Sequence, residues 1–358
     1  MRYGQLHPKP RRFPKVSIRV LAVLLATTAC LSPDAHGAIR RLNVPPRLQW
    51  NANFGYCGET SFISAGLAHG QYCSQYEARR LASPGVPQSQ PESQLLLGVN
   101  DRAAAKAMRL QTVSWNAAQQ SKSRDFLQWT KAQVLAGHIP IIGVFTNEFL
   151  FYDDRNRSAG DPEYDHIVPV TGIQSAGAIN SFSKTFFGSD QVIFSDNGLW
   201  DPSGIPPYIF RYRFDGFPRS RSAANAPNAP AYSLNSTGSN YGIAVTGVAD
   251  RNKETIPVRI QTNLNSESPA MRDGSNDPPA PSPLELTVTV SLPDRTRSYV
   301  LYRYDTFERV PVAQFNAHAN QAAQSWQIPS HSGPSFVVTL TIPSNKSAIF
   351  RAVRATAR

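Results

Sequence analysis

Apolar residues in the first half of the chain recur at two spacings, and the wider one predicts helices. Within residues 58–67, Ile63, Gly66 and Leu67 lie at the i, i+3 and i+4 positions of one helix face. A second helix is expected over residues 123–136, because Ser and Asp at its start provide a cap and a glycine follows its last turn.

Short apolar runs in the same half predict buried strands. Residues 139–145, 166–173 and 191–196 are rich in Val, Ile or Phe and are bounded by turn-forming residues. Residues 84–92 and 218–231 are rich in Pro, Ser and Ala, so we expect surface loops there. The first half is therefore predicted to contain both helices and strands.

A change in composition divides the chain. Residues 266–283 contain five prolines together with Gly, Ser and Asp, which is typical of a linker or a long loop. Strands are expected at residues 256–260, 284–292, 299–304, 336–342 and 348–353. Residues 286–290 alternate apolar with polar, as in a half-buried strand. The fold class predicted is α+β, with a mixed domain over residues 38–252 followed by a small β-sandwich over residues 253–358.

The positive charge does not indicate a nucleic-acid partner. The 358 residues carry a formal charge of +11. Residues 1–37 hold six basic residues and one acidic residue, which accounts for +5 of this total. The remaining +6 is spread along the chain without a basic run, so we expect no nucleic-acid binding.

The N-terminal segment has the features of an export signal. A basic stretch precedes the apolar run 20–26, and small residues Ala35 and Gly37 precede a predicted cut before Ala38. The apolar run is too short to span a membrane, which takes about 20 residues. The four residues ending at Cys30 weakly resemble a lipoprotein cleavage site, and a retained interfacial segment is a further alternative. We expect secretion, extracellular or periplasmic, with no integral membrane span.

After this cut two cysteines remain, Cys57 and Cys73. If the residues after Cys57 are helical, the 16 positions between the two carry the chain about 24 Å at ~1.5 Å each. A disulfide needs Cα atoms within about 7 Å. We therefore expect a free Cys57 and a buried, apolar Cys73, unless Gly66 or Gly70 turns the chain back.

Cys57 is placed as a nucleophile would be. It lies between Gly55 and Gly58 at the start of the first predicted helix. A helix N-terminus and a nearby imidazolium both favour thiolate, so we expect a lowered pKa for Cys57. Glycine beside the thiol lets a substrate backbone approach closely.

His166 is the expected base. The other histidines lie in the predicted signal, in a helix or loop, or in the β half: His7, His36, His69, His138, His318 and His331. His166 begins an apolar strand and shares one strand face with Val168 and Val170. A base on a rigid strand is well placed to activate a thiol.

A third group should accept a hydrogen bond from the other ring nitrogen of His166. Asp196 and Asn197 end the next predicted strand, and we favour Asp196 because a carboxylate also stabilises an imidazolium. Asn197 is the alternative third member, and a plain Asp-Asn-Gly turn is the structural alternative. Asp165 should point to the opposite strand face from His166.

This order of residues resembles the papain-like cysteine peptidase superfamily. Gln49 precedes Cys57 at a helix start, His166 begins a strand, and Asp196 or Asn197 follows on the next strand. The segments Gly-His-Ile-Pro-Ile-Ile-Gly-Val and Asp-His-Ile-Val-Pro-Val-Thr-Gly-Ile are most similar to the branch related to bacteriocin-leader-processing peptidases.

The resemblance covers residues 45–200 and implies that Gln49 supplies an oxyanion-hole amide beside the backbone N–H of Cys57. The eight-residue gap between Gln49 and Cys57 is longer than is usual for papain, which leaves Asn51 and Asn53 as alternatives. The 30-residue gap from His166 to Asp196 implies a hairpin excursion within it.

These features predict a secreted cysteine peptidase or amide hydrolase that acts on a peptide or protein substrate through a thioester. A transglutaminase-like acyltransferase and a non-enzymatic binding or effector protein on the same scaffold are the alternatives. We expect no cofactor and no metal, because no Cys-x-x-Cys pair, histidine cluster or phosphate-binding loop occurs in the chain.

Overall fold

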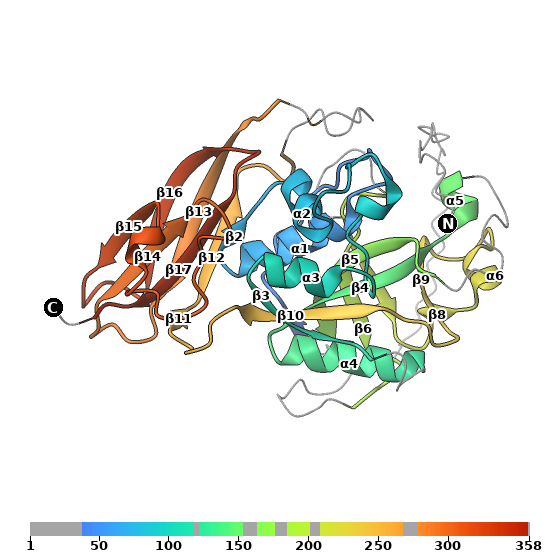
Figure 1. The fold of residues 1–358 in the computed structure, drawn as a ribbon. Helices are drawn as coiled ribbons and strands as arrows, with labels where there is room; N and C mark the ends of the chain where they lie inside the picture. The colour runs from blue at the N-terminus through green and yellow to red at the C-terminus, as the bar shows by residue number, and fades with distance from the viewer. Residues whose placement is uncertain are drawn as a thin grey trace, which may run out of the picture.

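Helices and largely antiparallel sheets occur together, so the chain has an α+β fold (Figure 1). The computed structural model describes residues 38–116, 122–152, 163–175, 185–200, 208–267, 278 and 280–356. The predicted signal segment and Cys30 lie outside the described residues.

A nine-stranded sheet supports the first half. Its strands are β1 (Ile39–Arg41), β3 (Leu110–Ser114), β4 (Ile139–Thr146), β5 (His166–Gln174), β6 (Gln191–Ser195), β7 (Ile209–Arg213), β8 (Pro218–Arg219), β9 (Tyr232–Asn235) and β10 (Gly242–Val248). The main order is β3-β10-β4-β5-β6-β7, with β1 on β5 and β9 on β4. The three predicted strands of this half are confirmed as β4, β5 and β6. Gln174 pairs with Gln191, so β5 and β6 are antiparallel neighbours, as the predicted hairpin requires.

The described part of the first half contains six helices, two of which pack on the sheet in two separate hydrophobic cores. The helices are α1 (Cys57–Ala68), α2 (Gln75–Ala82), α3 (Asp101–Ala107), α4 (Ser123–Leu135), α5 (Glu148–Tyr152) and α6 (Arg221–Ala224), with short 3-10 turns at Pro91–Ser93 and Ala319–Gln321. Both predicted helices are confirmed, as α1 and α4. Ile167 of β5 belongs to the core under α1, and its neighbour Val168 belongs to the core under α4. Because side chains alternate along a strand, β5 contributes apolar residues to both cores.

The second half contains two further antiparallel sheets, at the left of Figure 1. The five-stranded sheet holds β2 (Gln71–Tyr72), β11 (Thr255–Ile256), β14 (Tyr299–Tyr304), β15 (Gln324–Ile328) and β17 (Ala348–Arg354). The three-stranded sheet holds β12 (Val258–Thr262), β13 (Pro283–Ser291) and β16 (Ser335–Pro343). Four of the five strands predicted for this half are present, as β13, β14, β16 and β17. The predicted strand 256–260 is divided at Pro257 between β11 and β12, which belong to different sheets, and β15 was not predicted.

The two halves share one core and one sheet. Gln71 and Tyr72 pair with β17, and Phe350 donates its backbone N–H to the Gly70 oxygen at 2.8 Å. Residues from α1, β2 and the two sheets of the second half form a single hydrophobic cluster. The predicted boundary at residue 252 falls in the exposed residues 251–253 between β10 and β11, although the buried cluster includes residues from both sides of it. Glu267, near the start of the predicted linker, is also buried.

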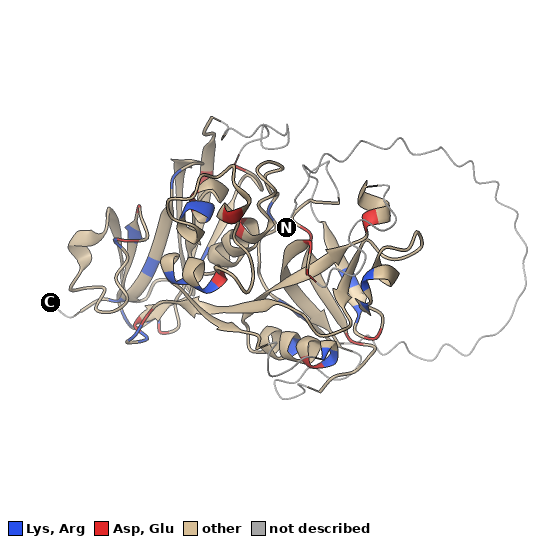
Figure 2. Cartoon of the chain, turned by 45° about the vertical axis from the view of Figure 1, so that its right-hand side comes forward, with Lys and Arg blue, Asp and Glu red and all other residues tan. Residues whose placement is uncertain are grey.

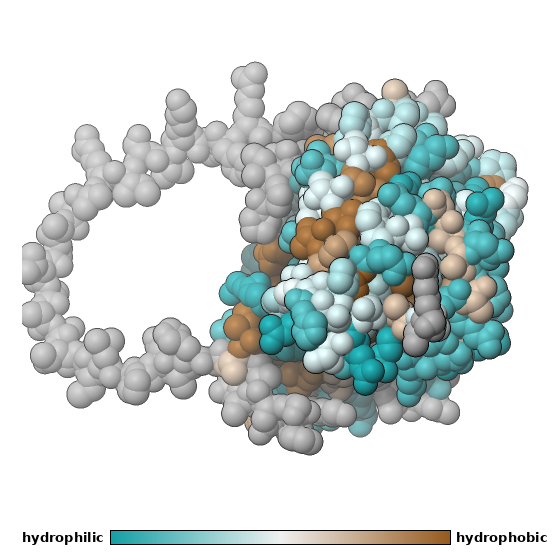
Figure 3. All heavy atoms as spheres, turned by 90° about the vertical axis from the view of Figure 1, so that its left-hand side faces the viewer, coloured by the Kyte–Doolittle hydropathy of each residue, from teal (hydrophilic) through white to brown (hydrophobic). Residues whose placement is uncertain are grey.

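Positions of positively and negatively charged residues are interspersed along the described chain in the view of Figure 2. The end of the second half, seen in Figure 3, has a band of apolar side chains between polar ones. Val337 of β16 is the most exposed of the large apolar residues in this half, at 53%. In the described part of the chain, no helix has the length and apolar character needed to cross a membrane.

Candidate functional site

The loop before Cys57 is held in an unusual backbone conformation. Asn53, Phe54 and Gly55 have positive φ angles of 48°, 70° and 88°. Arg79 of α2 donates to the backbone oxygen of Asn53 at 2.7 Å and to that of Gly55. Its guanidinium carbon also lies 3.5 Å from the centre of the Tyr56 ring. One buried arginine therefore holds three residues of this loop.

A buried ion pair connects this loop to α1. Arg79 Nε lies 2.6 Å from Oε1 of Glu59, which also accepts the backbone N–H of Leu95 at 3.1 Å. A Cβ on Gly58 would lie 2.0 Å from the Leu95 oxygen, so only glycine fits at that position. Neither Arg79 nor Glu59 is predictable from the sequence, since no local pattern distinguishes them from ordinary helix residues.

The two cysteines in the described part of the chain, Cys57 and Cys73, are free, as expected, and Cys73 is buried. Cys57 is partly exposed at the first position of α1. Burial raises the pKa of Cys57 to about 12, and Glu59 adds to this effect. The backbone amides of Ile167 and Gly58 oppose it without overcoming it. The expectation of a lowered pKa is therefore corrected: desolvation outweighs the helix N-terminus, and the resting thiol is protonated.

The imidazole of His166 is held in one tautomer. Its Nε2 lies 2.9 Å from the backbone oxygen of Asp196. A carbonyl oxygen can only accept a hydrogen bond, so Nε2 carries the proton and Nδ1 carries the lone pair of the neutral ring. Burial lowers the pKa of His166 to about 4, partly offset by the bond to Asp196. The ring also stacks on Tyr232, with centroids 5.9 Å apart.

The Asp196 carboxylate bonds away from this ring, which differs from the expected role. It accepts the backbone N–H of Gly198 at 3.0 Å and of Trp200 at 2.9 Å, and the Tyr232 hydroxyl at 3.0 Å. The carboxylate thus closes the Asp-Asn-Gly turn, the structural alternative considered from the sequence. Asp196 therefore bonds His166 with its backbone oxygen and not with its carboxylate.

Asn197 joins the helix that carries Cys57 to the strand that carries His166. Its Nδ2 lies 3.3 Å from the Cys57 oxygen, 3.1 Å from Ser61 Oγ and 3.0 Å from the Ile167 oxygen. Its φ is 55°, a left-handed conformation that Asn tolerates better than most residues. Asn197 is therefore placed between the two predicted reactive residues without bonding the imidazole.

Cys57 and His166 lie on adjacent elements, but no hydrogen bond joins the thiol to the ring among the described residues. The backbone N–H of Ile167, next to His166, is a hydrogen-bond partner of the thiol. Asp165 behaves as expected and bonds elsewhere, with its oxygens 2.6 Å from each terminal nitrogen of Arg221. In free enzymes, catalytic hydrogen bonds are often long and tighten when substrate binds.

Gln49 lies in the same turn network. Its backbone N–H donates to the Asn197 oxygen at 2.9 Å. Its side-chain Nε2 lies 3.8 Å from where a Cβ would stand on Gly55, two residues before Cys57. The alternative Asn53 directs its amide nitrogen to the Tyr56 hydroxyl at 3.3 Å. The Gln49 amide therefore lies beside the loop that precedes Cys57.

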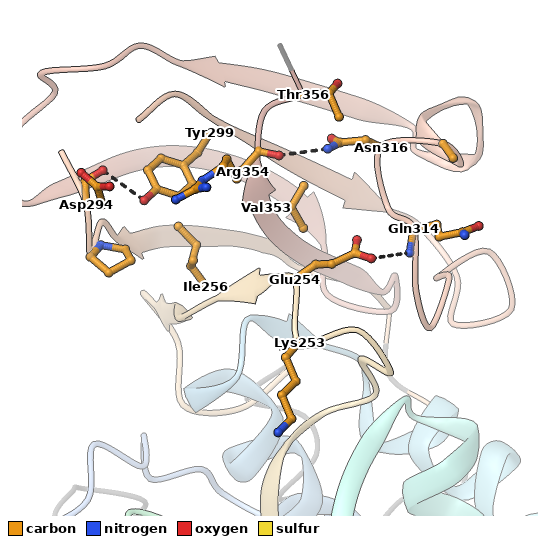
Figure 4. Close-up of a pocket in the computed structure, with 12 residues that line it drawn as sticks. Lys253, Glu254, Ile256, Asp294, Tyr299, Gln314, Asn316, Val353, Arg354 and Thr356 are labelled. Carbon is orange, nitrogen blue, oxygen red and sulfur yellow. Dashed lines mark hydrogen bonds between the residues drawn. The ribbon is translucent and has the colours of Figure 1, made fainter. Parts of the chain in front are cut away.

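A separate hollow of about 660 Å³ lies on the second half (Figure 4). Its polar lining includes Lys253, Glu254, Asp294, Tyr299, Asn316 and Arg354. Glu254 accepts the backbone N–H of Gln314 at 3.0 Å, and Asp294 accepts the Thr296 hydroxyl at 2.6 Å. No cysteine or histidine lines it, so it is distinct from the Cys57 region. Among the residues that the structure describes, no cluster of three His, Cys, Asp or Glu could hold a metal ion.

Comparison of the chain with protein-family models, with curated proteins and with solved structures finds no match.

Proposed function

We propose that the chain is a secreted cysteine peptidase or related amide hydrolase, with a papain-like domain followed by a β-sandwich-like domain. The observation that carries this proposal is the tautomer of His166, whose Nε2–H is engaged by the Asp196 oxygen at 2.9 Å. The ring therefore keeps a lone pair on Nδ1. Cys57, a partly exposed residue whose thiol is buried, lies at the start of the adjacent helix.

The first chemical step would be acyl transfer to the thiol. Nδ1 of His166 takes the proton from the Cys57 thiol as sulfur attacks the scissile carbonyl carbon. The oxyanion accepts hydrogen bonds from the Cys57 backbone N–H and from Gln49 Nε2. The C–N bond then breaks, His166 returns its proton to the leaving amine, and a thioester remains on Cys57.

Hydrolysis would complete the cycle. Nδ1 takes a proton from water, and the resulting hydroxide oxygen attacks the thioester carbon. The C–S bond breaks, the protonated ring returns the proton to sulfur, and a carboxylic acid leaves. Because both groups are neutral at rest, proton transfer accompanies the attack and no standing thiolate–imidazolium pair is needed.

Labelling with an epoxide probe of cysteine peptidases, followed by mass spectrometry of the peptides, tests this function. We expect one adduct, on Cys57, that disappears in His166→Ala and persists in Cys73→Ala. Equal labelling of Cys57 in the presence and absence of His166, or no adduct, would favour a non-enzymatic binding protein. Transfer of the acyl group to an added amine in preference to water would favour the acyltransferase.

A further inference from the structure

The segment that carries Gln49 is held from the second half of the chain. The Leu48 backbone N–H donates to the Asn265 oxygen at 2.8 Å. Arg47 Nη1 donates to the Leu264 oxygen at 3.3 Å and to Thr262 Oγ1 at 3.2 Å. Both residues immediately before Gln49 therefore bond residues 262–265, which comprise the last residue of β12 and the three that follow it.

Gln75 connects the other side of Gln49 to the same region. Its Oε1 accepts the backbone N–H of Trp50 at 2.7 Å, and its Nε2 donates to the Leu48 oxygen at 3.0 Å. Nε2 also donates to Glu267 Oε2 at 2.6 Å, and the Gln75 backbone N–H donates to Glu267 Oε1 at 3.2 Å. One amide group thus bonds the residues on both sides of Gln49.

The Glu267 carboxylate is one of the groups that determine which way this amide faces. A carboxylate accepts hydrogen bonds, so the NH2 group of Gln75 faces Glu267 as well as the Leu48 oxygen, while Oε1 receives the Trp50 N–H and the Thr60 hydroxyl at 2.9 Å. Glu267 therefore acts together with Leu48, Trp50 and Thr60 in fixing this amide. Glu267 is 3% exposed and lies 3.7 Å from Arg47 Nη2. Burial raises the pKa of Glu267, while Arg47 and Gln75 act in the opposite direction. A buried pair of this kind is costly to break from one side.

We propose that Glu267 is a positioning residue for the oxyanion donor Gln49, so that the second half of the chain is part of the catalytic unit. This inference rests on the peptidase function proposed above. Residues after β12 would then affect turnover, because Glu267 bonds Gln75 and Gln75 bonds the backbone on both sides of Gln49. Since Glu267 lies far from Cys57 in sequence, no local motif indicates it.

The test is a double-mutant cycle measured as turnover of a random-sequence fluorogenic peptide pool. Glu267→Gln places a second NH2 group against Gln75 and should lower kcat by about 10- to 100-fold with KM within about twofold. Gln49→Ala should lower kcat by ~10²-fold or more. Glu267→Gln combined with Gln49→Ala should show no loss beyond Gln49→Ala alone, because the positioned donor is already absent. Glu285→Gln, an exposed glutamate on β13, is the control.

Multiplied losses in the double variant would overturn the proposal, since a purely structural role of Glu267 predicts independent effects. Glu267→Asp keeps the charge and shortens the side chain, and it should show a partial loss of kcat with an unchanged circular-dichroism spectrum. Wild-type kcat in Glu267→Asp and Glu267→Gln would also overturn it. An active wild type with additive variants refutes this inference alone, whereas a wild type that hydrolyses no peptide refutes the proposed function as well.

Discussion

His166 receives its orientation from the backbone oxygen of Asp196, which lies 2.9 Å from Nε2. A side-chain substitution leaves that oxygen in place. We therefore expect Asp196→Asn to reduce kcat/KM by less than about tenfold, although it should cost about 1–3 kcal/mol of stability by placing an NH2 group among hydrogen-bond donors. Steady-state kinetics on the folded fraction checks this. A loss near 10⁴-fold, as expected when an aspartate carboxylate orients the base, would contradict it.

Asn197 should matter more for folding than Asp196. Asn197→Asp replaces the Nδ2 donor by an oxygen facing the backbone oxygens of Cys57 and Ile167. We expect a loss of more than about 2 kcal/mol in the free energy of unfolding. The buried oxygens of Cys57 and Ile167 would then face a carboxylate oxygen, and none of the three could donate a hydrogen bond. Urea denaturation measures it. Asn225→Asp is a suitable comparison, since Asn225 is also buried but its Nδ2 donates no hydrogen bond among the described residues.

Because Cys57 and His166 are both neutral at rest, we expect an unusual pH dependence of thiol alkylation and of kcat/KM. Since the pKa of Cys57 is raised to about 12, its alkylation by iodoacetamide should still be increasing between pH 9 and pH 11. Since the pKa of His166 is lowered to about 4, the ring stays a competent base down to about pH 5, and the acid limb of kcat/KM should lie near pH 4. An alkylation plateau below pH 8 would show that a thiolate is present at rest.

Part of the fold follows from local periodicity. The elements that were not predicted, among them α2, α3, β3 and β10 as well as β2 and β15, have more than one physical cause. Apolar spacing predicted α1, α4, β4, β5 and β6 because each has a buried face or is buried on both sides. β15 (Gln324–Ile328) was not predicted, since its side chains are mostly exposed and lack an alternating apolar pattern. β2 has two residues and exists through its pairing with β17, which no local pattern can indicate.

The sequence indicates the reactive residues of the candidate site, but it does not indicate the hydrogen bonds between them. Cys57 and His166 could be selected from their positions at element starts. That Asp196 would meet the ring by its main chain, and that Asn197 would bond the Cys57 oxygen, depends on the turn that follows β6. The raised pKa of Cys57 depends on burial and on Glu59, which are properties of the packed structure.

Close packing over the start of α1 gives a test at two glycines. A Cβ on Gly58 would lie 2.0 Å from the Leu95 backbone oxygen, whereas a Cβ on Gly216 would have no atom within 4 Å. Gly58→Ala should therefore lower the free energy of unfolding by about 3 kcal/mol or more. Gly216→Ala should leave it within about 1 kcal/mol, with a slight gain from reduced freedom of the unfolded chain. Thermal unfolding of both variants decides; equal Tm values would mean that residues 94–97 do not pack there.

Cutting the chain between the two halves should not separate them. A site-specific protease sequence inserted after Gly274 leaves β12 on the N-terminal fragment and β13 on the C-terminal fragment, although Val258 of β12 pairs with Val290 of β13. β2 of the N-terminal fragment also pairs with β17 of the C-terminal one. Both pairings bury apolar side chains of one shared cluster, so dissociation would expose a large apolar area at roughly 25 cal/mol per Å².

We therefore expect the cleaved fragments to elute together in size-exclusion chromatography and to separate only in denaturant. The uncut protein with the same insertion is the control for the insertion itself. Recovery of a soluble C-terminal fragment on its own would show that the second half folds independently, as the change in composition at residues 266–283 first suggested. Because β12 would stay with the other fragment, that outcome would also require β13 to be stable with β16 as its sole neighbour in the three-stranded sheet.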